Sequence, residues 1–319
     1  MPTATPTAAP TAAPSGKTAL ALTAAAGSGA LVAVQQRLNG DLRLDVGDPV
    51  LAALVSFGTG LLVVVVVVAS RRSSRQALPS LRSVPGWLRL GGLGGATLVV
   101  AGAAATPIIG VALFTVGLVA GQTAGGLLVD RIGLGPGGRH GLTAPRLAGA
   151  LVCIIAVGVS VLGKGARAAD PLLLVLVVLG GFLIALQQAL NGRIRHATGD
   201  AGVATLVNFV VGTSALALLL GLRDLLHPLQ FGHWPGLDRW YLYLGGPIGA
   251  IFVAVAATIV RLLGVLRLGL AVVAGQLISA VLLDSGLPGG AGIEATTGLG
   301  AGLTLGAVAI SGLRPKVPS

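Results

Sequence analysis

The chain consists mainly of long apolar stretches separated by short polar segments. A helix needs roughly 20 predominantly apolar residues to cross the hydrocarbon core of a bilayer. Ten stretches approach or exceed that length, at 18–38, 49–70, 90–106, 108–129, 147–163, 171–190, 201–221, 241–259, 264–283 and 295–313. The break between the third and fourth rests on Pro107 and Gly110. The pattern predicts an all-α polytopic membrane protein with ten transmembrane helices.

The composition supports a membrane protein and excludes an ordinary soluble domain. Hydrophobic residues make up 54% of the 319 residues and charged residues 10%, with a mean hydropathy of +0.92, whereas a soluble domain is about 25% charged. The net charge of +11 is spread over short patches between apolar runs, so we expect no nucleic-acid partner. Residues 1–16 are Thr-, Ala- and Pro-rich and uncharged, and we expect them to form a disordered tail.

The short loops carry an uneven distribution of basic residues, and this sets the predicted orientation. With ten spans, the side of the amino terminus receives 15 Lys and Arg residues and the opposite side 6. Basic residues are retained on the cytoplasmic side of membrane proteins. We therefore expect a multi-pass protein of the plasma membrane with both termini cytoplasmic. The use of Arg in preference to Lys and the Ala-, Gly- and Val-rich composition favour a GC-rich bacterial genome, and hence a bacterial inner membrane.

An internal duplication is the most informative feature of the sequence. Residues 35–60 align without gaps on residues 187–212, and 13 of the 26 positions are identical. The shared pattern is QQxLNGxxR followed by GD and by Phe and Gly, and VAGQ recurs at 119–122 and 273–276. Each copy contains five predicted spans. Because five is odd, the second copy enters the membrane upside down, which is a recurrent plan of secondary transporters.

The two copies divide the chain into a first five-helix repeat at 17–165 and a second at 166–319. Their QQxLNG…GD…F…G and GQ…D pattern resembles the YdcZ-like family of the drug/metabolite transporter superfamily. In that family a five-helix unit of about 150 residues occurs singly or fused in tandem. The resemblance implies two inverted five-helix halves and movement of a small solute across the cell membrane. It does not supply the substrate.

Polar side chains inside predicted spans are the candidates for a substrate pathway, because such residues face the bundle interior or a water-filled cavity. They are Gln35, Gln36, Gln122, Gln187, Gln188, Gln276, Ser56 and Asn208. Asn and Gln also serve as interhelical hydrogen-bond partners, each contributing about 1 kcal/mol. The sequence leaves both roles open for the glutamines.

Four further polar residues fall at predicted helix ends. Asn39 and Asn191 each precede a glycine, which favours a carboxy-terminal turn, and Asp48 and Asp200 stand where the next helix begins. Helix capping is the favoured interpretation for these four, and a role as gates is the alternative.

The sequence shows no Asp, Glu or Lys in the middle of any predicted span, which disfavours proton antiport through a buried carboxylate. The clusters suit a neutral or zwitterionic solute. The one cysteine and four histidines have no metal-site spacing, and no catalytic triad has a scaffold, so we expect neither a metal, a cofactor nor an enzyme. A non-transporting membrane scaffold or partner subunit remains the alternative function.

Two glycine stripes repeat at every fourth position, Gly117–Gly121–Gly125 and Gly298–Gly302–Gly306. Small residues at that spacing let helices approach closely. For the second stripe we favour packing inside the bundle over a homodimer interface.

Overall fold

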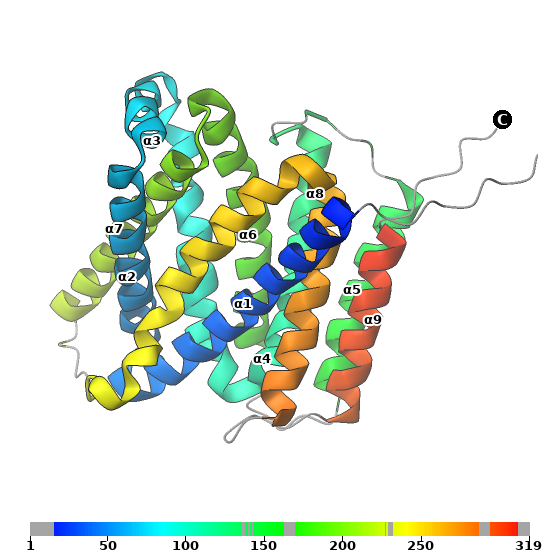
Figure 1. Ribbon diagram of the computed structural model, residues 1–319. Helices are drawn as coiled ribbons and strands as arrows, with labels where there is room; N and C mark the ends of the chain where they lie inside the picture. The colour runs from blue at the N-terminus through cyan, green and yellow to red at the C-terminus, as the bar shows by residue number, and fades with distance from the viewer. Residues whose placement is uncertain are drawn as a thin grey trace, which may run out of the picture.

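The computed structural model describes residues 16–135, 138–139, 141, 143–162, 170–226, 228, 232–286 and 294–311; the side chains of 16, 18, 146, 254, 256–270 and 308–311 are not described. Its helices are α1 (Gly16–Val46), α2 (Pro49–Ser70), α3 (Arg72–Ala77), η1 (Leu78–Ser83), η2 (Gly86–Gly91), α4 (Gly92–Ile132), α5 (Ala144–Val161), α6 (Pro171–Thr198), α7 (Ala201–Leu226), η3 (Leu237–Leu244), α8 (Gly245–Gly286) and α9 (Ala295–Ser311). These residues contain no strand, and the helices form one bundle (Figure 1). The predicted tail lies outside the described residues except for Gly16.

Helix boundaries follow ordinary capping chemistry. α1 and α6 are each followed by a glycine with positive φ, Gly47 at 81° and Gly199 at 72°, a conformation that glycine adopts without strain. The next helix begins directly afterwards, with Asp48 as the N-cap and Pro49 as the first residue of α2. The duplicated GD dipeptide is therefore a helix-stop and helix-start signal in both repeats.

Five helical segments are long and apolar enough to cross a membrane by length and composition. They are 19–46, 49–70, 86–132, 171–198 and 201–226, and shorter apolar helices occupy 147–161 and 271–286. Within the described residues, the expected third and fourth spans are joined in α4, and the eighth and ninth are joined in α8.

α4 is a hairpin of two helical arms. Gly110 interrupts it with φ 79° and ψ 164°, and Pro107 lies one turn earlier. Its contacts with α6 reverse direction at this point. In the first arm, Gly94 lies against Leu183 and Gly180 against Leu98; in the second, Gly117 lies against Val177, Gly121 against Val178 and Gly125 against Ala185. The first arm therefore runs antiparallel to α6 and the second parallel to it.

α8 makes the same reversal against α1. Its early residues pair with late residues of α1, and its later residues follow α1 in the same direction. The pairs are Gly245 with Asn39 and Gly249 with Gln35, then Gly275 with Ala26 and Ala280 with Ala33. Figure 1 shows the yellow first part of α8 rising to the top of the bundle and its orange second part descending from there.

The two repeats exchange their hairpins. The first helix of each repeat packs along the hairpin of the other: α1 along α8, and α6 along α4. The equivalent helices α2 and α7 pack antiparallel, because Asp48 meets Arg223 at one end and Ser74 meets Asp200 at the other. α5 and α9 pair at one edge of the bundle (Figure 1). The antiparallel pairing of α2 with α7 shows that these equivalent helices of the two repeats run in opposite directions.

The two glycine stripes have different surroundings. Gly121 of the first stripe lies so close to α6 that a Cβ on it would approach the carbonyl oxygen of Val178 to 1.9 Å. Gly302 and Gly306 of the second stripe are exposed, and a Cβ on either would meet nothing within 4 Å. They line an apolar groove of about 860 Å³ on the outer face of α9, together with Val152 of α5. Internal packing is therefore wrong for the second stripe; Gly300, against Ser160, makes the close contact instead.

Candidate functional site: two polar clusters related by the repeat

A first polar cluster, which consists of Gln35, Asn39 and Ser56, joins α1 and α2 to the start of α8. The exposed fractions of these side chains are 8%, 0% and 2%. A Cβ on Gly245 would lie 2.3 Å from Asn39 Oδ1 and 3.0 Å from Ser56 Oγ. One helical turn further on, a Cβ on Gly249 would lie 2.7 Å from Gln35 Nε2. Glycine at both positions lets the polar side chains of one repeat reach the backbone of the other.

A second polar cluster, Gln187, Asn191 and Asn208, repeats this arrangement in the other half. Asn191 Nδ2 donates a hydrogen bond to Asn208 Oδ1 at 3.2 Å. A Cβ on Gly95 of α4 would lie 2.7 Å from Gln187 Oε1 and 3.5 Å from Asn208 Nδ2, and one on Gly91 would lie 3.1 Å from Asn191 Oδ1. Each member of this cluster stands 152 residues after its counterpart in the first, with Asn208 in place of Ser56.

The sequence prediction missed the glycines that face the clusters. They belong to a second repeated motif, LGGLGGA at 90–96 and LGGPIGA at 244–250. The two copies stand 154 residues apart, the same spacing as the two VAGQ segments. A search for short glycine-containing matches at that spacing would have found them.

Several polar atoms of the clusters are buried and have no hydrogen-bond partner among the described residues. They are Asn39 Nδ2 and Oδ1, Ser56 Oγ, Gln187 Oε1 and Asn191 Oδ1. A buried polar group without a partner costs about 1–3 kcal/mol, and native structures contain few of them. Unpartnered buried atoms also occur elsewhere in the bundle, but those of the clusters stand in equivalent places of the two repeats. This is expected of polar groups that are satisfied in another state of the protein or by a ligand.

Phe57 and Phe209 separate the two clusters at the crossing of α2 and α7. Their ring centroids are 5.1 Å apart and the rings are tilted by 39°. Both phenylalanines are buried, and Phe57 Cζ would lie 3.2 Å from a Cβ on Gly95, in the second cluster. Gly60 and Gly212 make the crossing possible, because a Cβ on either would approach a phenylalanine ring to 2.3 Å or less.

The remaining predicted glutamines do not all join the clusters. Gln36 is fully buried, packs on Gly102 of α4, and has no side-chain partner within the described part of the chain. Its counterpart Gln188 is exposed. Gln276 is buried and Gln122 half-buried; their backbone nitrogens lie against Gly29 and Gly181 at equivalent helix crossings. The equivalence of the two repeats is therefore incomplete around the Gln36 and Gln188 positions.

Of the four residues expected at helix ends, Asp48 and Asp200 do stand at the start of a helix. Asp48 caps α2 by accepting hydrogen bonds from the backbone of Val50 at 2.8 Å and Leu51 at 2.9 Å, and it also pairs with Arg223 at 2.8 Å. Asp200 accepts from the backbone of Val203 at 3.0 Å and from Ser74 Oγ at 3.0 and 3.1 Å.

The expected carboxy-terminal turns at Asn39 and Asn191 are wrong. α1 continues to Val46 and α6 to Thr198, so both asparagines lie inside a helix. The physical reason is that backbone groups in an apolar surrounding must be satisfied within the helix, and this outweighs the preference of an Asn-Gly pair for a turn.

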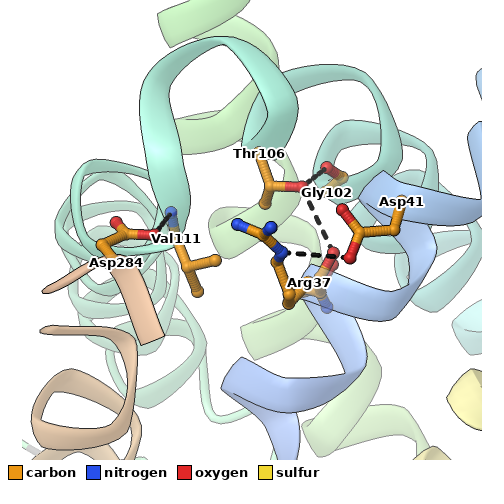
Figure 2. Close-up of polar contacts among 7 residues, drawn as sticks. Arg37, Asp41, Gly102, Thr106, Val111 and Asp284 are labelled. Atoms are coloured by element: carbon orange, nitrogen blue, oxygen red, sulfur yellow. Dashed lines mark hydrogen bonds and ion pairs between the residues drawn. The ribbon is translucent and has the colours of Figure 1, made fainter. Parts of the chain in front are cut away.

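A second missed residue, Asp284, ties α8 to the broken hairpin of α4. Its carboxylate, 4% exposed, accepts hydrogen bonds from the backbone of Val111 at 3.1 Å and of Ala112 at 2.8 Å (Figure 2). These two N–H groups begin the second arm after Gly110, where a helix terminus leaves donors unpaired and carries a partial positive charge. Asp130 stands 154 residues before Asp284, the same spacing as the two VAGQ segments, and this repeat of an aspartate was the available signal.

The same region contains an ion pair on α1. Arg37 Nε donates to Asp41 at 3.1 Å, one turn further along the helix. Thr106 of α4, beside them, donates through its hydroxyl to the backbone oxygens of Gly102 and Gln36 (Figure 2). The bond from Thr106 to Gln36 holds α1 against the α4 hairpin.

A cavity of about 370 Å³ opens beyond the second cluster, at the end of α6. Its lining includes Arg193 and His196 of α6, Leu88 of η2 and Gly133 after α4. Two of its lining residues, Arg193 and His196, are basic or titratable, and both follow Asn191 on α6.

Comparison with known proteins agrees with the division of the chain into two repeats. No curated protein matches the chain. A crystal structure, whose title names no function, is 18% identical and superposes with a TM-score of 0.57, covering 92% of this chain and 96% of its own, which supports the fold alone. A family model described as "Putative inner membrane exporter, YdcZ" matches twice, at residues 20–159 and 172–310, one match for each repeat. The chain is thus a tandem two-repeat member of the YdcZ family of drug/metabolite transporters.

Proposed function

We propose that the protein exports a small solute across the inner membrane by alternating access between two inverted repeats. The observation that carries this proposal is the equivalence of the two polar clusters, which lie on either side of Phe57 and Phe209 and face glycines of the opposite repeat. Two near-equivalent halves can exchange conformations, so that one cluster opens while the other closes. The unpartnered polar atoms would then be satisfied in turn by water or by the solute.

Ten membrane crossings follow if each arm of α4 and of α8 counts as one. The reversals of α4 at Gly110 and of α8 within its length support this count. An even number of crossings agrees with Figure 1, in which the start of α1 and the end of α9 lie at the same end of the bundle. With the basic residues on the inner side, this end is cytoplasmic and the cavity beside Arg193 is the inner mouth.

Flux through reconstituted liposomes tests the proposal. We expect the full chain to move at least one solute from a broad panel, and replacement of both Gln35 and Gln187 by leucine to abolish that flux while insertion persists. Gln76→Leu, at an exposed position on α3, is the matched control and should keep the wild-type rate. Absence of flux for every solute with the wild type would refute transport and leave the scaffold alternative.

A further inference from the structure

We propose that the solute is uncharged and carries a carboxamide-like group, with an N–H donor and a C=O acceptor side by side. The inference rests on the proposed function, and it starts from the side chains that form the two clusters. All six side chains are neutral: five carry a carboxamide, and Ser56 carries a hydroxyl.

Arg193, two residues after Asn191, lies on another side of α6, about 200° round the helix, where it lines the cavity at the end of that helix. The charged groups nearest in sequence to the first cluster are already engaged. Asp48, two helical turns before Ser56, is held by Arg223 and by two backbone N–H groups. Arg37, between Gln35 and Asn39, pairs with Asp41. An ion that enters a low-dielectric site needs an opposite charge to replace its hydration, and the cluster side chains supply none. A neutral solute avoids that penalty.

The unpartnered atoms include donors as well as acceptors. Asn39 has both a free Nδ2 and a free Oδ1 among the described residues, Ser56 Oγ can donate or accept, and Gln187 and Asn191 each present an oxygen. A carboxamide satisfies one donor and one acceptor of a facing Asn side chain in a single planar pair. A carboxylate offers acceptors alone and an amidinium donors alone, so each leaves part of the set unsatisfied.

Both clusters are tightly packed against the glycines that face them. Phe57 Cζ, Gln187 Oε1 and Asn208 Nδ2 all lie within 3.5 Å of the position where Gly95 would carry a Cβ. The pseudo-equivalent glycine in the first cluster, Gly249, approaches Gln35 equally closely. A solute that pairs with these side chains therefore needs the helices to move apart, as alternating access provides.

Three probes of the same shape separate the charge classes: benzamide is neutral, benzoate is an anion and benzamidinium is a cation. We expect millimolar benzamide to raise the melting temperature of the purified full chain in detergent, while benzoate and benzamidinium do not. Stabilisation by benzoate or benzamidinium in preference to benzamide, or by none of the three, overturns the inference.

Substitution at Asn208 changes the expected order. Asn208→Asp adds a carboxylate in the second cluster and should make benzamidinium bind at least about tenfold more tightly than benzamide, because a charge-assisted hydrogen bond replaces a neutral one. Asn208→Ser carries the residue of the equivalent position 56 and should keep the preference for benzamide. Gln76→Glu, the same change of charge at an exposed site, should leave the wild-type order unchanged. An unchanged order in Asn208→Asp contradicts the assignment.

The liposome experiment keeps this inference distinct from the proposed function. Flux of charged solutes with no flux of neutral amides means that transport stands and the assigned solute class fails. Flux of neutral amides supports both, and no flux of any solute removes both.

Discussion

Removal of the Asp284 carboxylate should destabilise the protein strongly, because this side chain of the second repeat caps a broken helix of the first. In Asp284→Ala the N–H groups of Val111 and Ala112 lose their acceptor in a buried place. A hydrogen bond to a charged group contributes about 1.5–3 kcal/mol, so two of them set the expected loss at about 3–6 kcal/mol. Asp284→Asn keeps a neutral oxygen and should lose less.

Asp170 provides the matched control. It caps α6 through one hydrogen bond, from Leu172 N at 2.9 Å, and it is exposed. Loss of an exposed N-cap costs about 1 kcal/mol. The free energy of unfolding of both alanine variants should be measured by denaturant titration of the full chain in detergent micelles. A loss in Asp284→Ala no larger than that in Asp170→Ala would refute the role of Asp284 as a link between the repeats.

Three further predictions concern packing, pairing and topology. Gly121→Ala should lower the free energy of unfolding in micelles by about 1–3 kcal/mol, because the new methyl meets the backbone of α6. Gly302→Ala, in open space, should change this free energy by less than about 0.5 kcal/mol. Equal losses would contradict the packing of α4 on α6. A double-mutant cycle on Asp48 and Arg223 should give a coupling energy of about 1 kcal/mol, since the arginine side chain is 39% exposed. Asp48→Ala alone should lower the free energy of unfolding further, because α2 also loses its N-cap. Zero coupling would show that the ion pair contributes nothing. In intact cells, a cysteine at Leu237, which is 93% exposed, should react with an impermeant thiol reagent, while one at the exposed Ser73 should react after the cells are broken; the reverse result would invert the topology.

The all-helical membrane class and the repeat could be predicted from sequence because both depend on patterns along the chain. Long apolar runs indicate helices that cross hydrocarbon. The gapless match between two segments 152 residues apart indicates a duplication. The exact helix ends were less predictable. The Asn-Gly pairs at 39–40 and 191–192 favour turns in water, but the helices continue through them.

The relation between the halves could not be predicted, because it depends on tertiary packing. No local pattern indicates that α1 packs on α8 and α6 on α4, or that Gly91 and Gly245 face the asparagines of the opposite repeat. The same limit applies to Gln36 and Gln188, which occupy the same position of the QQxLNG motif, yet one is buried and the other exposed. Their burial is decided by the neighbouring helix.

The exchange of hairpins has a consequence for how the protein can be divided. A single repeat expressed alone would leave its first helix without the glycine-lined hairpin that covers it, and its own hairpin without the helix that fills it. Two separate halves could restore these contacts if they met in opposite orientations in the same bilayer. The fused chain is in effect an antiparallel dimer joined by one linker, because α2 and α7 run in opposite directions.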